Sequence, residues 1–128
     1  MLSSFLVSVT VSMVLTQVAV FSTTIFLHRA ATHRAITLHP AVAWFFRLSI
    51  WITTGLNVRQ WVAVHRKHHA HTDEIGDPHS PYLEGFWSVQ LGNVFHYVRE
   101  ASRETVLDQY AKDIKEDWWE RTLFGRGV

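Results

Sequence analysis

The N-terminal apolar run constrains the fold of this chain more than any other feature. Residues 1–27, MLSSFLVSVTVSMVLTQVAVFSTTIFL, carry no charged side chain. A helix of this length, rising about 1.5 Å per residue, is about 40 Å long and exceeds the ~30 Å hydrocarbon core of a bilayer. A signal peptide would instead have a basic start, an apolar stretch of about 7–15 residues and a cleavage site. The run therefore predicts a transmembrane helix over residues 1–27, with a core helix of a soluble protein as the alternative.

The charges beside this run predict how the helix is oriented. Arg29 and Arg34 follow it directly, and no basic residue precedes it. Lys and Arg close to the ends of a span favour the cytoplasmic side of the membrane. We therefore expect the His28 end of the helix in the cytoplasm.

A second apolar stretch, residues 40–58, carries Arg47 in its middle. Placing that side chain at the centre of a bilayer would cost at least ~2.5–3.5 kcal/mol. A helix that lies in the membrane interface or packs against the protein avoids this cost. We therefore expect residues 40–58 to form a helix that does not span the bilayer.

Charged side chains dominate the C-terminal part of the chain, from Arg99 to Arg121. Apolar residues recur there at intervals of three and four, which is typical of one face of an amphipathic helix. They are Leu107, Tyr110, Ile114 and Trp118. The pattern predicts a single charged amphipathic helix over residues 99–124.

The polar composition restricts the chemistry. The chain has no cysteine, which excludes disulfides and thiolate-bound metals, so any metal must be held by nitrogen and oxygen atoms. Its formal net charge of +1 gives no reason to expect a nucleic-acid partner. Nine histidines in 128 residues are many, and several of them are clustered.

The clusters have different helical spacings. His65, His68 and His69 are at positions i, i+3 and i+4, which places three imidazoles on one face of a helix. His28 and His33 are five residues apart, about 140° on a regular helix, and would share a face only through distortion or an intervening metal cluster. Neutral imidazoles bind Zn, Cu, Fe and Ni, and five of them suggest two metal ions.

The remaining histidines are weaker candidates for metal binding. His71 points to another side of the predicted helix. His39 and His96 belong to neither cluster, and we expect ordinary hydrogen-bonded or solvated side chains there.

These motifs resemble a known family. HRAATHR (residues 28–34) and HRKHH (residues 65–69) are similar to the first two histidine boxes, HxxxxH and HxxHH, of the integral-membrane fatty-acyl desaturases, in particular their acyl-CoA branch. The apolar segment before the first box, the stretch from Asn57 to Trp61 and DEIGDPHSP (residues 73–81) extend the resemblance over essentially the whole chain.

The resemblance implies an all-α, integral-membrane helical bundle with the histidine boxes on cytosolic helices. We expect residues 1–128 to form part of one desaturase domain. It would comprise the transmembrane helix 1–27, a histidine-box region 28–98 and the charged helix 99–124. The implied reaction is the O2-dependent, di-iron introduction of a cis double bond into an acyl chain, carried on coenzyme A or a lipid, in unsaturated fatty acid biosynthesis. No haem-binding or flavin-binding segment is visible, so an external electron donor is implied, such as ferredoxin or cytochrome b5 with its reductase.

The resemblance also implies roles for individual residues. It assigns the iron ligands to His28, His33, His65, His68 and His69. Trp61 resembles a residue lining the acyl tunnel, and Asn57 and Arg59 are further candidates for substrate binding. Arg59, Arg66 and Lys67 are expected either to meet coenzyme A phosphates or to form a solvated basic face. Asp77 and His79 resemble an element that supports the ligands or orders the loop.

One departure from the family limits these expectations. The third histidine box is absent from the 128 residues, where His96 alone follows His79. We therefore expect part of a desaturase that is inactive by itself. A di-iron membrane hydroxylase and a non-catalytic membrane metal-binding protein remain alternatives.

Overall fold

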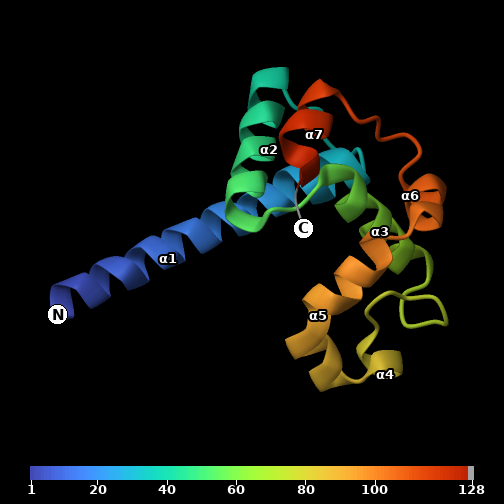
Figure 1. Cartoon of the computed structure of the whole chain (residues 1–128), viewed down its shortest axis with the longest axis horizontal. Coiled ribbons are helices and arrows are strands. Elements are labelled where there is room, and N and C mark those ends of the chain that lie inside the picture. Colours follow the sequence, from blue (N-terminus) through green and yellow to red (C-terminus); the bar gives the residue numbers. More distant parts are fainter. Residues whose placement is uncertain (127–128) are drawn as a thin grey trace. The chain divides into compact units, whose positions relative to one another are not determined.

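The structure, a computed structural model, describes residues 1–126, and helices are its regular elements (Figure 1). No strand occurs in this described range, so the predicted all-α class is confirmed. The helices form two compact units, residues 1–56 and residues 57–126. The first unit contains α1 (Leu2–Ser22), η1 (Thr23–Thr32) and α2 (Pro40–Thr54). The second contains α3 (Val58–Ala70), α4 (Pro81–Glu84), α5 (Phe86–Ala101), α6 (Glu104–Tyr110), α7 (Trp118–Thr122) and η2 (Phe124–Arg126).

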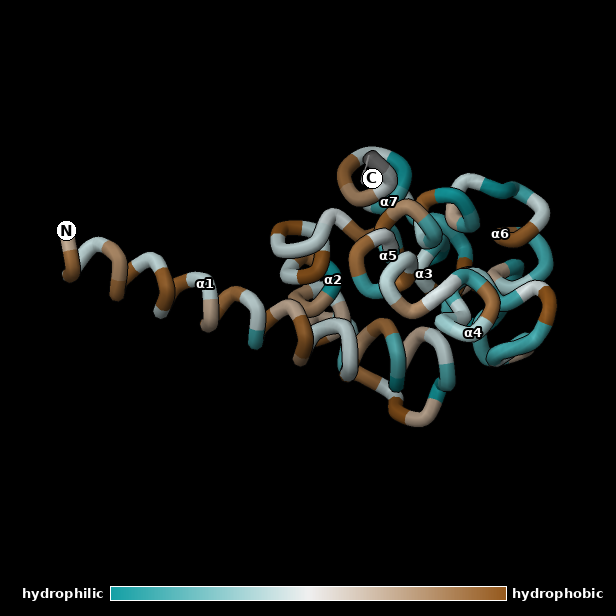
Figure 2. Tube along the Cα trace, turned by 90° about the horizontal axis from the view of Figure 1, so that it is seen from below, coloured by the Kyte–Doolittle hydropathy of each residue, from teal (hydrophilic) through white to brown (hydrophobic). Residues whose placement is uncertain are grey.

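The first unit is built on one long apolar helix. α1 continues without a break into η1, and Leu2–Thr32 is long and apolar enough to cross a membrane. Its large side chains are exposed, as at Phe5 (64%) and Met13 (64%), and its trace is mostly brown and white in Figure 2. An exposed apolar surface of this size is typical of a helix that contacts lipid. Length and composition thus suit the predicted span over residues 1–27, which stays a prediction.

α2 is a shorter helix with a defined start and end. The Nδ1 atom of His39 accepts a hydrogen bond from the Ala41 N–H, and Pro40 occupies the first turn. Gly55 ends the helix with a φ of 69°, a conformation that glycine adopts without strain. The resulting 15 residues are about 22 Å long, too short to cross ~30 Å of hydrocarbon. Phe46 of α2 packs on Phe21 of α1, with ring centroids 5.9 Å apart.

α3 lies at the centre of the second unit. Its residues Val62, Ala63 and Val64 are at most 3% exposed, and the helix packs against α5 and α6. Asn57 caps its first turn by accepting a hydrogen bond from the Gln60 N–H at 2.9 Å. The Asn57 Nδ2 atom also donates to Glu120 Oε1, at 2.6 Å, which ties the start of α3 to α7.

The predicted single helix over residues 99–124 is wrong. α5 ends at Ala101, α6 spans Glu104–Tyr110 and α7 spans Trp118–Thr122. The Tyr110 carbonyl, which would accept an N–H in a continuing helix, instead accepts a hydrogen bond from Arg66 Nη1 of α3. Asp117 then caps a new helix by accepting a hydrogen bond from the Glu120 N–H. Contacts with the rest of the unit therefore override the apolar periodicity of this segment.

Candidate metal centre

The second histidine box brings two imidazoles together on α3. His65 and His69 lie one turn apart, and their Nε2 atoms are 3.1 Å from each other. Two nitrogens bound to one ion at about 2.0–2.1 Å would have a similar separation, so the pair fits a shared transition metal. Trp61, one turn earlier, stacks on His65 with ring centroids 4.4 Å apart and an interplanar angle of 18°. The indole thus limits the positions open to the His65 ring.

An unusual helix brings the two histidines of the first box, His28 and His33, into contact. Residues Thr23–Thr32 form a π-helix, and the His33 N–H donates to the His28 carbonyl at 3.1 Å, five residues back. The two imidazoles are in edge contact, with centroids 4.5 Å apart. A regular helix would separate them by about 140°. The wider turn provides the distortion that the spacing required, and π-helical turns often occur at functional sites.

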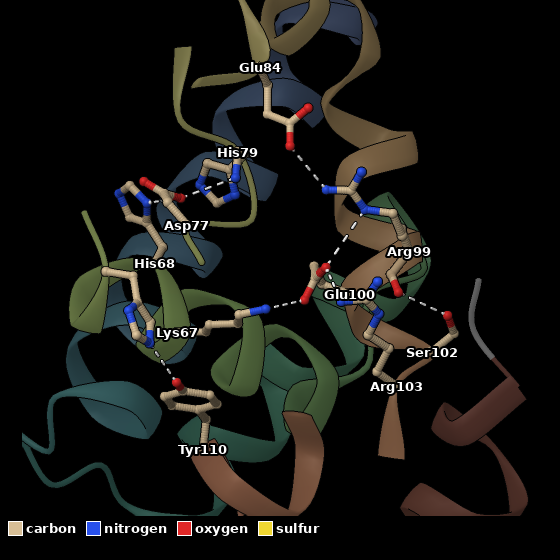
Figure 3. A network of polar contacts seen from close by, with 11 residues as sticks. Lys67, His68, Asp77, His79, Glu84, Arg99, Glu100, Ser102, Arg103 and Tyr110 are labelled. Atoms are coloured by element: carbon tan, nitrogen blue, oxygen red, sulfur yellow. Dashed lines mark hydrogen bonds and ion pairs between the residues drawn. The ribbon is translucent and has the colours of Figure 1, made fainter. Parts of the chain in front are cut away.

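His68 faces a different set of groups from its neighbours in the box. Its Nδ1 atom lies 2.9 Å from Asp77 Oδ1, and its ring stacks on His79 with centroids 4.5 Å apart (Figure 3). The sequence motif GDPH had suggested a supporting role for Asp77 and His79. It did not reveal the pairing with His68, because a loop contact over nine residues has no periodic signature.

The electrostatic environment of Asp77 favours its ionised form. Burial alone would raise the pKa of this carboxyl, but hydrogen bonds from His68 and from the backbone N–H groups of Asp73 and His79 outweigh it and lower the pKa. Burial, followed by the nearby His68, lowers the pKa of His79 and favours its neutral form. The loop thus offers one buried anion to the His68 ring.

The three basic residues considered for phosphate binding all have acidic partners. Arg59 Nη2 lies 2.9 Å from Asp108 Oδ1, and Arg66 Nη1 lies 2.6 Å from Asp113 Oδ1. Lys67 pairs with Glu100, whose side chain is 3% exposed. These pairs connect α3 to the elements that follow it, so the structure gives all three residues a structural role. A role of Arg59 in substrate binding stays a prediction, as it does for Asn57 and Trp61.

Glu100 is the centre of an ionic cluster that supports α3. Besides Lys67 it contacts Arg103 Nη1 at 2.9 Å and Arg99 Nε at 3.6 Å, and Arg99 reaches Glu84 at 3.4 Å (Figure 3). Lys67 and Glu100 form the buried pair of this cluster, and removing one partner of such a pair typically costs about 3–5 kcal/mol, because the other charge is left uncompensated. The cluster therefore holds α5 against the helix that carries the second box.

The other histidines have hydrogen-bond partners of their own. His96 Nε2 lies 3.0 Å from Ser88 Oγ, and His39 caps α2. Both predictions of ordinary hydrogen-bonded side chains are confirmed. His71 Nε2 lies 2.9 Å from the Tyr110 hydroxyl, away from the pair formed by His65 and His69.

Comparisons with known proteins identify relatives over most of the chain. The model of the fatty acid desaturase family matches residues 3–125. The Delta-9 desaturase-like 2 protein of Arabidopsis thaliana is 36% identical over 100 residues, which are 75% of this chain and 31% of the relative. An acyl-CoA C20 Delta5-desaturase of Anemone leveillei is 44% identical over 73 residues, 53% of this chain and 22% of that protein. The sn-1 stearoyl-lipid 9-desaturase of a Synechocystis strain is 29% identical over 94 residues, 73% of this chain and 28% of that protein.

The chain thus spans about a third or less of the length of these relatives. No solved structure matches it. The family model covers nearly every residue, and both histidine boxes lie inside the matched range. The chain belongs to the fatty acid desaturase family.

Proposed function

We propose that this chain supplies five ligands to the di-iron centre of a fatty-acyl desaturase. His28 and His33 would be donated by the first box, and His65, His68 and His69 by the second. The observation that carries the proposal is the His65–His69 pair, whose Nε2 atoms at 3.1 Å suit one ion. The contact between the His28 and His33 rings supports a second pair of ligands.

Bound iron would supply the activation of O2 needed to remove two hydrogens from an unactivated acyl chain. The protein's own contribution is to fix the imidazoles and to keep water from the reacting carbons. Trp61 suits this second task, because its half-buried indole lies directly beside His65. We propose that the acyl chain passes this indole, and that a separate protein such as ferredoxin or cytochrome b5 delivers the electrons.

The proposed substrate is a fatty acyl chain, with the carrier left open. The names of the relatives include both an acyl-CoA and a stearoyl-lipid desaturase. Both types of carrier are consistent with a chain that meets the membrane through α1.

Product analysis tests the proposed reaction. The chain would replace the matching 100-residue segment of the Arabidopsis relative, and this chimera would be expressed in a desaturase-deficient host. We expect iron in the purified protein and unsaturated acyl chains in the host lipids. Hydroxylated chains would identify a hydroxylase instead. A folded protein that contains neither iron nor product would support a non-catalytic role.

We also propose that both boxes face the cytoplasm, because Arg29 and Arg34 follow the apolar helix. The chain contains no cysteine, so a single introduced cysteine reports its own location. Ile75 is 92% exposed in the loop after α3 and is a suitable site. We expect Ile75→Cys to react with an impermeant maleimide in inverted vesicles and to be protected in intact cells. A cysteine at Ser3 should show the reverse pattern, and labelling of Ile75→Cys in intact cells would contradict the orientation.

A further inference from the structure

We propose that Asp77 is a positioning residue that fixes the tautomer of His68 and so presents the Nε2 atom of that ring to iron. This inference rests on the proposed function, since it concerns how one of the five ligands is prepared. It assigns a task to a loop residue outside both histidine boxes.

The hydrogen bonds of Asp77 define the tautomer. An ionised carboxylate only accepts hydrogen bonds, so the contact of 2.9 Å with Asp77 Oδ1 places the His68 proton on Nδ1. The same Oδ1 atom accepts the His79 N–H at 3.1 Å, and Oδ2 accepts the Asp73 N–H at 2.9 Å. With Nδ1 protonated, the free lone pair of the neutral His68 ring is on Nε2, the atom available to a metal.

The loop keeps the carboxylate in place. The Asp77 side chain is 0% exposed, and Ser80 Oγ donates to Asp73 Oδ1 at 2.8 Å, which closes the loop around it. Gly76 has a φ of 110°, and a Cβ there would lie 3.3 Å from the His71 ring. The positive φ of this turn therefore favours glycine, and a larger side chain would also need the His71 ring to shift slightly. The contacts of the loop thus hold the carboxylate next to His68.

The same three side chains, His68, Asp77 and His79, could be considered a metal site in their own right, because their ligand atoms lie within 4.8 Å of one another. The ring geometry argues against it. A metal lies close to the plane of each imidazole that binds it. The rings of His68 and His79 are stacked at 20° with centroids 4.5 Å apart, so their planes do not meet at a position between them. A proton on Nδ1, shared with Asp77, fits this geometry better than an ion.

The tautomer can be read without iron. In the apoprotein with 15N-labelled histidine, NMR correlations between ring nitrogens and carbons are expected to show His68 protonated on Nδ1. In Asp77→Asn, which keeps the shape but removes the charge, we expect His68 to shift toward the Nε2–H form. Asp73→Asn, in the same loop but without contact to His68, should leave the tautomer unchanged. An Nε2–H form of His68 in the unaltered apoprotein would overturn the proposal, whether or not the variants fold.

Iron affinity gives the second measurement. In the chimera with the Arabidopsis relative, Asp77→Asn is expected to weaken Fe(II) binding about 10–100-fold, as for other groups that orient metal-bound histidines. Ser80→Ala loosens the loop and leaves the Asp77 carboxylate intact, so it should have a much smaller effect. Equal losses in both variants with an unchanged tautomer would show that the loop, and not the carboxylate, matters. Absence of iron from the unaltered protein would instead refute the proposed function, while the tautomer measurement would still stand.

Discussion

Replacing His69 with alanine is expected to remove iron and unsaturated product together, whereas His71→Ala should retain both. The two residues lie at the same end of α3 but have different surroundings. His69 Nε2 lies 3.1 Å from His65 Nε2, while His71 is bonded to the Tyr110 hydroxyl. Groups that merely orient a ligand are worth about 10–100-fold in metal affinity or activity, so loss of a ligand should cost at least about 100-fold.

His71→Ala is the matched control, because it removes an imidazole two residues away at a cost of about one hydrogen bond, or ~0.5–1.5 kcal/mol of stability. Both variants would be made in the chimera with the Arabidopsis relative. Iron would be measured by elemental analysis and product by chromatography of the acyl chains. His96→Ala, in neither box, should also retain both. Similar losses in all three variants would indicate general destabilisation, and the ligand assignment would then fail.

Residues 1–128 expressed alone are expected to make no unsaturated product. The two boxes provide five imidazoles, whereas the di-iron sites of helical-bundle proteins use about six protein side chains. Binding of a single ion by the second box remains compatible with this expectation. In a desaturase-deficient host, residues 1–128 alone should give no unsaturated product, whereas the chain joined to a segment with the third box should give it.

Residues 1–128 alone and the fusion protein must be present in the membrane in equal amounts for this comparison. Joining the chain to a segment with the third box should restore product, and the same fusion with His69→Ala should not. If residues 1–128 alone formed unsaturated chains, the five-ligand argument would be wrong. Assembly of several copies, each completing the ligand set of another, would then be the first explanation to examine by crosslinking.

The features read correctly from the sequence are those with a local physical cause. The uncharged N-terminal run gave one long helix, and the i, i+4 spacing of His65 and His69 gave adjacent nitrogens. Helical spacing did not reveal that His68 turns to Asp77, because the i, i+3, i+4 pattern places three Cβ atoms on one face but does not fix the side-chain torsions. The partner of each imidazole then depends on the loop that follows.

The prediction for residues 99–124 was wrong because contacts with residues distant in the sequence determine where the helices end. A continuous helix over residues 99–124 would satisfy the apolar pattern. In the structure, Arg66 donates hydrogen bonds to the Tyr110 carbonyl and to the Asp113 carboxylate, and α6 ends at Tyr110. The five-residue spacing of His28 and His33 was noted as incompatible with a regular helix. It matches the i→i+5 hydrogen bond of the π-helix, which propensities do not predict because such helices are rare.

The unbroken helix Leu2–Thr32 has a mechanical consequence for the first histidine box. If this helix spans the membrane as predicted, the depth at which it lies in the lipid also sets the height of His28 and His33 above the hydrocarbon, because α1 and η1 are continuous. The uncharged run, at about 40 Å, is longer than a typical core of ~30 Å, and such a mismatch is relieved by tilting or by local thickening of the bilayer. Acyl chains of different length and saturation change that thickness. In a desaturase built on this helix, the proposed ligands His28 and His33 would therefore be raised or lowered as the thickness of the surrounding bilayer changes.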